Sequence, residues 1–455
     1  MPITSYNPAT GKEIKSYQTH SAEEVEAKLR LSEKTFTQWR RSDVASRARL
    51  MRAAAEVLRQ NKSRYAARMT EEMGKLAREG EGEIEKCAWV CDYYAEHAEA
   101  FLAEEPISTD ASYSSVVYQP IGPVLAVMPW NFPFWQVFRF AAPNLMAGNV
   151  GLLKHASNVP GCALDIEEVF REAGFPAGCF QTLLIGSDRV EDVIRHDAVK
   201  AVTLTGSTPA GRAVAAVAGQ ALKKTVLELG GSDPYVILED ADLDLAVEKC
   251  ATSRMINSGQ SCIAAKRFIV VEEVYDTFVE KFRQRLAEFE TGDPSNPKTK
   301  LGPQARQDLR NELHMQVQKS VEAGAEVVLG GAVPESEGAF YPATMLIHVE
   351  KGMPAWEEEL FGPVASVIRA KDEKDAILIA NDTNFGLGAA VFTRDVARGR
   401  RIAAFELEAG CCFVNDFVRS DPRLPFGGIK TSGYGRELAR HGIREFVNAK
   451  TVYVS

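Results

Sequence analysis

The spacing of apolar residues divides the chain near residue 121. Before this point they recur at helical spacing, beginning after the capping-box pair Ser21 and Glu24, so we expect the first hundred residues to be helical. Beyond it, short apolar runs alternate with amphipathic segments. They predict strands at 124–128, 150–154, 182–185, 199–205, 225–229 and 235–238, and helices at 162–173 and 209–222. This alternation indicates an α/β fold with a parallel sheet, whose ligands bind at the carboxyl ends of the strands.

The segment from about 231 to 430 repeats this alternation and is interrupted by Gly-Pro turns at 302–303 and 362–363. The tail at 451–454 is a short run of β-branched and aromatic residues with no strand partner nearby in the sequence. We expect this tail to pair across a subunit boundary, by addition to the edge of a sheet.

The composition is that of an ordinary globular protein, because 45% of the 455 residues are hydrophobic and 25% are charged. At about 150 residues per domain, this length suggests roughly two to four domains. The formal net charge of -9 makes nucleic acid a poor default partner, and no apolar run approaches the roughly 20 residues that span a membrane. The eight cysteines include no paired zinc-binding spacing and the N-terminus shows no targeting signal. We therefore expect a cytoplasmic protein without a metal site.

Three polar residues stand out as candidates for catalysis. Cys262 follows the small and polar residues 257–261, a context that suits a thiol on a tight turn. Glu228 ends an apolar run before a glycine pair, where burial would raise the pKa of its carboxyl group and suit it to act as a general base. Asn131 lies between two prolines, as a rigid amide donor for an oxyanion. Taken singly, the alternatives are a buried structural cysteine, a paired glutamate and a turn asparagine.

Two further segments suit a nucleotide. Lys154 ends a predicted strand and could bind ribose hydroxyls or phosphate, or could be a solvated strand end. The turn at 205–211 joins a strand to a helix, and a helix N-terminus with a Gly-Ser entry accommodates phosphate. No GxGxxG fingerprint occurs in the chain, so these residues alone leave the nucleotide undecided.

In combination, these segments and others resemble the aldehyde dehydrogenase superfamily, and the resemblance covers nearly the whole chain. The segments that carry it are 129–133, 154, 206–211, 228–231, 259–262, 359–363 and 425–428. The resemblance implies that Cys262 is the nucleophile, Glu228 the base and Asn131 an oxyanion donor. It also implies a set of cofactor contacts, namely Trp130, Lys154, Ser157, Gly206, Ser207, Gly211, Leu229, Glu359 and Phe361. Because the dinucleotide fold of this family uses fewer phosphate contacts, the missing glycine fingerprint is no objection.

The fold that the resemblance implies has a Rossmann-type cofactor domain, an α/β catalytic domain and a small β oligomerisation element. We expect the cofactor domain at residues 1–101 and 121–230, and the catalytic domain at 231–430. The oligomerisation element is expected at 102–120 and 431–455. A homodimer or a homotetramer follows from this fold, and the sequence does not choose between them.

These residue types fit the oxidation of an aldehyde to an acid. Attack by the Cys262 thiolate gives a thiohemiacetal, whose oxyanion would be held by Asn131 and by the backbone N–H of Cys262. Loss of hydride to the nicotinamide leaves a thioester, and water deprotonated by Glu228 would release the acid. A CoA-acylating aldehyde dehydrogenase, which does not need this glutamate, and a non-catalytic paralogue are the alternatives.

Ser157 bears on the choice of cofactor. Many NAD-preferring relatives carry Glu at this position, three residues after the lysine, and that carboxylate would repel a 2′-phosphate. A neutral hydroxyl removes the repulsion while Lys154 supplies positive charge, so we expect NADP to be preferred, with NAD as the weaker cofactor. His155 replaces the proline that usually follows this lysine.

Arg139 bears on the substrate. It follows Asn131 by eight residues, which on a helix is about 12 Å. It resembles the arginine of the succinate-semialdehyde dehydrogenase branch that pairs with the substrate carboxylate. The other predicted substrate residues are Trp135, Ser261 and Ser420, with Arg419 as a weaker candidate. We therefore expect succinate semialdehyde or a similar short ω-semialdehyde as substrate. The alternative substrates are glutarate semialdehyde and small aliphatic aldehydes. The alternative for Arg139 is a structural role, in which it bridges to an acidic helix.

Overall fold

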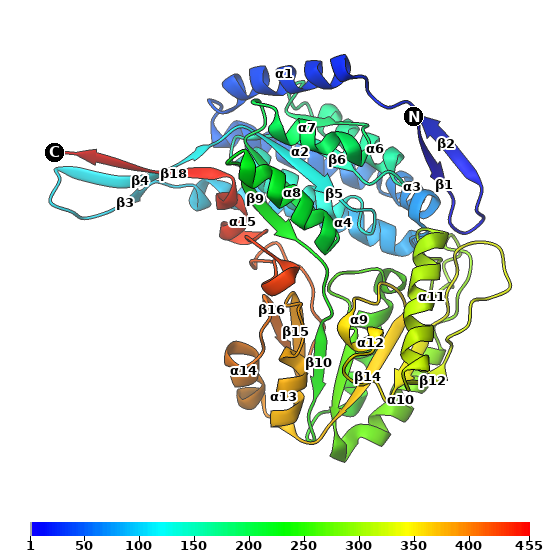
Figure 1. The fold of residues 1–455 in the computed structure, drawn as a ribbon. Coiled ribbons are helices and arrows are strands. Elements are labelled where there is room, and N and C mark those ends of the chain that lie inside the picture. The colour runs from blue at the N-terminus through cyan, green and yellow to red at the C-terminus, as the bar shows by residue number, and fades with distance from the viewer. Residues whose placement is uncertain (1) are drawn as a thin grey trace.

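The structure is a computed structural model that describes residues 2–455. Two large sheets, of six and seven strands, form the upper and lower halves of the molecule in Figure 1. A separate three-stranded sheet extends to one side and carries the C-terminus at its tip. The two large sheets confirm the predicted α/β fold, with a Rossmann-like half and a second α/β half.

A short β-hairpin precedes the N-terminal helices. Its strands β1 (Ile3–Tyr6) and β2 (Glu13–Tyr17) pair antiparallel, so the prediction that the first hundred residues are helical is wrong at its start. Gly11 lies in the connecting turn with φ of 69°, a conformation that glycine adopts without strain. The predicted helices then follow, the first with its Ser21–Glu24 capping box: α1 (Ala22–Trp39), α2 (Val44–Gln60), α3 (Lys62–Met73) and α4 (Ala77–Phe101).

The six-stranded sheet has the order β17-β9-β8-β5-β6-β7, and all its strands except β17 are parallel. The strands are β5 (Pro123–Met128), β6 (Val150–His155), β7 (Phe180–Thr182), β8 (Ala201–Thr205), β9 (Lys224–Glu228) and β17 (Gly433–Tyr434). The helices between them are α5 (Trp135–Met146), α6 (Pro160–Glu172), α7 (Val190–Arg195) and α8 (Thr208–Gln220). The strand expected at 182–185 lies at 180–182, because residues 183–185 leave the sheet while staying buried in the core.

The seven-stranded sheet has the order β12-β13-β14-β11-β10-β15-β16, and only β12 runs antiparallel to its neighbour. Its strands are β10 (Pro234–Ile237), β11 (Arg267–Val271), β12 (Glu326–Leu329), β13 (Thr344–Ile347), β14 (Val364–Ala370), β15 (Gly388–Phe392) and β16 (Cys411–Val414). Its helices are α9 (Leu243–Met255), α10 (Tyr275–Ala287), α11 (Gln307–Glu322), α12 (Pro354–Glu357), α13 (Glu373–Asn381) and α14 (Val396–Phe405).

The C-terminal strand pairs within its own chain. β18 (Val447–Val454) runs antiparallel to β4 (Tyr113–Pro120) along its whole length, and β3 (Glu105–Pro106) completes the three-stranded sheet. The tail therefore has a strand partner in its own chain that is distant in the sequence, while β18 remains the edge strand of its sheet, so its pairing across a subunit boundary stays a prediction. The residues before β18 belong elsewhere: β17 joins the six-stranded sheet, and α15 (Ala439–Glu445) packs against α5 and α4.

No helix in residues 2–455 has the length and apolar character that crossing a membrane requires. The helix α5 instead is buried at every one of its 12 positions, at the centre of the molecule between α4 and the six-stranded sheet. Polar side chains on this helix therefore face protein or an internal cavity, where they need specific partners.

Candidate active site

The loop that carries Cys262 has a constrained backbone. Three residues in succession, Asn257, Ser258 and Gly259, have φ of 53°, 55° and 76°. Residues with a side chain rarely adopt this left-handed conformation, so the surrounding structure must hold the loop in place. A Cβ atom at Gly259 would lie 2.2 Å from the carbonyl carbon of Gly362. The loop therefore turns sharply against the 362–363 segment before it presents Cys262.

The thiol of Cys262 lies against the carboxylate of Glu228. Sγ donates to Oε1 at 3.3 Å, and both residues are buried. Burial raises the pKa of Glu228 to about 7, and it raises the pKa of the Cys262 thiol well above its usual value. A carboxylate with this pKa can take a proton from the thiol, or from water that approaches the same sulfur. The pair has the geometry of a nucleophile beside its base.

Arg139 lies on the other side of Glu228. Its guanidinium pairs with Glu228 at 3.4 Å and also with Glu437, and it packs over the ring of Phe426 at 4.7 Å. Burial is the main cause that raises the pKa of Glu228, Glu437 adds to it, and Arg139 opposes it. The pairing of Arg139 with the substrate carboxylate stays a prediction, and the structure shows this guanidinium engaged by two carboxylates of the protein. Arg139 lines the same cavity as Cys262, but two carboxylates already balance its charge, as in a structural role.

Asn131 is fixed beside the Cys262 loop by three hydrogen bonds. The side-chain Nδ2 of Asn131 donates to the main-chain carbonyl of Gln260 at 3.2 Å. The main-chain carbonyl of Asn131 accepts from Lys75 Nζ at 2.9 Å and from Asn257 Nδ2 at 2.8 Å. A side-chain amide has two N–H donors, so one remains for a ligand. The amide lines a cavity together with Cys262, as an oxyanion donor must.

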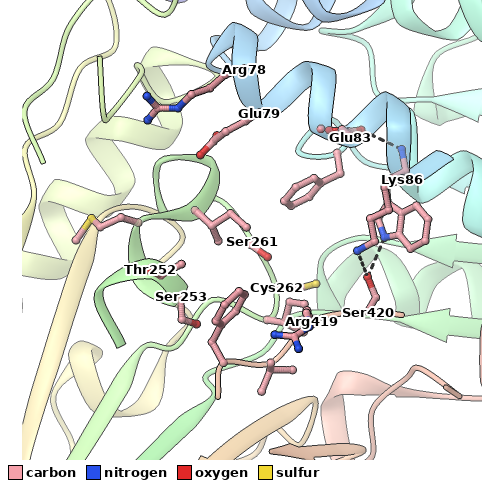
Figure 2. Close-up of a pocket in the computed structure, with 18 of the residues that line it drawn as sticks. Arg78, Glu79, Glu83, Lys86, Thr252, Ser253, Ser261, Cys262, Arg419 and Ser420 are labelled. Carbon is pink, nitrogen blue, oxygen red and sulfur yellow. Dashed lines mark hydrogen bonds between the residues drawn. The ribbon is translucent and has the colours of Figure 1, made fainter. Parts of the chain in front are cut away.

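Two cavities meet at Cys262, and Gln136 also lines both. The first, of about 800 Å³, has a mainly apolar wall and contains all of the predicted substrate residues, namely Trp135, Arg139, Ser261, Ser420 and the weaker candidate Arg419 (Figure 2). The second has a volume of about 250 Å³. Cys262 is therefore accessible to two ligands, one from each cavity.

The second cavity brings together most of the predicted cofactor residues, namely Trp130, Gly206, Ser207, Leu229, Glu359 and Phe361. Ser207 caps the N-terminus of α8, where free backbone N–H groups attract an anion such as a pyrophosphate. The rings of Trp130 and Phe361 meet edge to face at 5.7 Å and form an aromatic wall for a planar base. These features fit a dinucleotide. Gly211 lies inside α8, where a Cβ atom would be 2.6 Å from Leu229, so it serves the close packing of helix on strand.

Lys154 and Ser157 lie outside the second cavity, at the carboxyl end of β6. This strand is parallel to β5 and next to it, so both residues are at the same sheet edge as Asn131. Lys154 is buried, which lowers its pKa, and no carboxylate in residues 2–455 forms an ion pair with it. Ser157 lines a separate cavity of about 600 Å³ beside β1. The pair is therefore set apart from the residues that surround Cys262.

Two lysines of the site were not identified from the sequence. Lys266 donates to the carbonyls of Cys262 at 2.6 Å and Ser261 at 2.9 Å, and it pairs with Glu359 at 3.4 Å. The sequence feature that could have identified Lys266 is its position four residues after Cys262. Lys86 on α4 lines the first cavity, and its neighbours in the sequence give no hint of this.

Comparisons with known proteins establish the family of the chain. Residues 1–452 match the aldehyde dehydrogenase family, and the chain belongs to that family. It is 50% identical over 455 residues to a Synechocystis protein named probable succinate-semialdehyde dehydrogenase, NADP(+), with 100% of both chains covered. It is 51% identical over 460 residues to succinate-semialdehyde dehydrogenase, NADP(+), 1 of Mycobacterium tuberculosis, again with 100% of both chains covered. The crystal structure of succinic semialdehyde dehydrogenase from Streptococcus pyogenes with NADP+ superposes with a TM-score of 0.97 at 38% identity, covering 99% of each chain.

Proposed function

We propose that this aldehyde dehydrogenase oxidises succinate semialdehyde to succinate and uses NADP+ as the hydride acceptor. One observation carries the proposal: Cys262 Sγ lies 3.3 Å from Glu228 Oε1, at the point where the two cavities meet. The names of relatives about 50% identical over the whole chain support the substrate and the cofactor. The position of Glu228 favours release of the acyl group by water over its transfer to CoA.

The first step forms a bond between the Cys262 sulfur and the aldehyde carbon. Glu228 takes the thiol proton, and the carbonyl oxygen becomes an alkoxide, held by Asn131 Nδ2 and the backbone N–H of Cys262. When bound, NADP+ would accept the hydride that leaves the former aldehyde carbon as the thioester forms. Ser207, Glu359 and the residues around them would hold it in the second cavity.

The second step hydrolyses the thioester. Once Glu228 has passed the thiol proton to solvent, it takes a proton from water, and the resulting hydroxide attacks the thioester carbon. The C–S bond breaks, the carboxylic acid leaves, and Cys262 is restored as the thiolate. Because the same carboxylate serves both steps, its pKa of about 7 suits it to accept and release protons at neutral pH.

Preference for NADP+ is part of the proposal and rests on Lys154 and Ser157. The ammonium of Lys154 has no carboxylate partner in the described residues, and no acidic side chain occupies position 157. The 2′-phosphate of NADP+ would therefore lie near the positive charge of Lys154 and the hydroxyl of Ser157, and no carboxylate would repel it.

The test compares kcat/KM for succinate semialdehyde and butanal, each with NADP+ and with NAD+. We expect succinate semialdehyde with NADP+ to be the best pair. In Ser157→Glu, kcat/KM for NADP+ should fall at least about tenfold, because like charges repel, while the value for NAD+ is retained. Ser157→Ala is the neutral control. A wild-type protein that prefers NAD+ or butanal would contradict the proposal.

We propose further that the protein is a homo-oligomer located in the cytoplasm, assembled through the three-stranded sheet. The outer edge of β18 is unpaired in the described residues, and Tyr453 and Val454 on it are about half exposed. The cofactor domain is then built around the six-stranded sheet and the catalytic domain around the seven-stranded sheet. Residues 105–120 and 447–454 form the oligomerisation element.

A further inference from the structure

The positive side chains around the first cavity differ in whether their charge is balanced. Arg139 pairs with Glu228 and Glu437. Arg285 pairs with Glu248 and Glu288. Arg78, Lys298, Lys300 and Arg419 are exposed, so water screens them, and Arg419 also pairs with Asp416 at 2.7 Å. Lys86 is partly buried in the wall, and it forms no ion pair with any of residues 2–455.

The carboxylates nearest to Lys86 are occupied by other partners. Glu83 pairs with Lys75 and accepts from the backbone N–H groups of Phe134 and Trp135, both at 2.9 Å. Asp421 pairs with Arg423 at 2.7 Å. Burial lowers the pKa of Lys86 to about 8, and Arg139 lowers it further, because Glu83 and Asp421 offset these effects only in part.

Glu79 is the other carboxylate of this cavity, and it lies at the opposite end from Lys86, next to Arg78 (Figure 2). Burial raises its pKa and so favours its neutral form. The end of the cavity that contains Lys86 therefore has a net positive charge.

Ser420 makes this end of the cavity a directed binding site. Its Oγ accepts from Lys86 Nζ and from Trp135 Nε1, each at 3.0 Å (Figure 2). A hydroxyl oxygen has two lone pairs, so both are used and the O–H is free to donate. The ammonium group, which packs over the Trp135 ring at 4.2 Å, keeps further N–H donors. An O–H and an N⁺–H next to each other match the two oxygens of a carboxylate.

We propose that Lys86 is the counter-ion for the carboxylate of an ω-carboxylated aldehyde and so determines the substrate specificity of this enzyme. The inference rests on the proposed function, since it concerns the far end of the cavity that Cys262 opens into. Arg139, by contrast, already has Glu228 and Glu437 as carboxylate partners.

The test is the ratio of kcat/KM for succinate semialdehyde to that for butanal, which has the same chain length and no carboxylate. Lys86→Gln keeps a donor to Ser420 and removes the charge. We expect it to raise KM for succinate semialdehyde about ten- to a hundredfold, and to leave kcat and the butanal parameters within about twofold. Lys86→Arg should retain most of the ratio. Arg285→Gln, which removes a cation of the same cavity that already has carboxylate partners, is the matched control.

Equal losses for both substrates in Lys86→Gln, or an unchanged ratio, would overturn the assignment of Lys86. So would a loss in Arg285→Gln as large as that in Lys86→Gln. If Lys86→Gln does not fold, as judged by circular dichroism, Lys86→Met with its apolar stem of similar length takes its place under the same criteria. A wild-type enzyme with no preference for succinate semialdehyde over butanal would instead refute the proposed function, and the two failures are therefore distinct.

Discussion

At the scale of single residues, we expect the buried group of Glu228, Arg139 and Glu437 to set the pH range in which the enzyme works. Glu228 must be deprotonated to take a proton from thiol or water, and its pKa of about 7 means that this form is lost below neutrality. We therefore expect kcat to fall as the pH drops through about 7. Arg139→Gln removes the charge that lowers this pKa and should move the acid limb of the profile upward, by about one pH unit.

Glu437→Gln is the paired test, because it removes the charge that raises the pKa of Glu228 and should move the acid limb downward. The rate of thioester hydrolysis, measured as a function of pH after a single turnover, reports this step directly. Shifts of the same sign in both variants would exclude the electrostatic explanation. A merely structural effect would lower the rate at every pH and leave the limb in place.

The sequence singled out the residues that we propose to act on the substrate carbon, but not those that balance the charge around them. Cys262, Glu228 and Asn131 each follow or end a short recognisable segment, so their roles could be predicted. The carboxylate partners of Arg139 are Glu228 and Glu437, which are far apart in the sequence. Lys86 has no carboxylate partner because Glu83 pairs with Lys75 and Asp421 pairs with Arg423. Such a balance is a property of the folded state, and local sequence does not contain it.

At the scale of elements, the Cys262 loop depends on one glycine. Gly259 has φ of 76°, and a side chain there would press on the backbone at Gly362. Gly259→Ala should therefore displace the nucleophile from Glu228, reduce kcat at least about a hundredfold and destabilise the fold by about 1–3 kcal/mol. Gly219→Ala in α8, where a Cβ atom would meet nothing within 4 Å, is the control and should be neutral or slightly stabilising. Unimpaired turnover in Gly259→Ala would show that the loop does not need this backbone.

The strands of the six-stranded sheet were largely predictable because they are buried on both faces and read as continuous apolar runs. The same rule misplaced β7, since residues 183–185 are equally apolar but pack in the core without pairing. The β1–β2 hairpin was missed because each strand has only four or five residues, too few for a periodic pattern to stand out.

At the scale of the whole molecule, the three-stranded sheet stands apart from both large sheets and has little core of its own. β18 is mostly exposed, and none of its residues is buried. Deleting residues 447–455 should therefore leave the two large sheets folded and yield a smaller assembly, measured by light scattering coupled to size-exclusion chromatography. Deleting Ser455 alone is the control. An unchanged mass for the longer deletion would exclude this sheet as the main contact between subunits.

The meeting of two cavities at a single sulfur atom also has a kinetic consequence. Because each ligand has a cavity of its own, we expect the spent dinucleotide to depart while the acyl chain is still attached on the other side. Neither product then has to wait for the other, and an accumulation of one should not trap its counterpart on the enzyme.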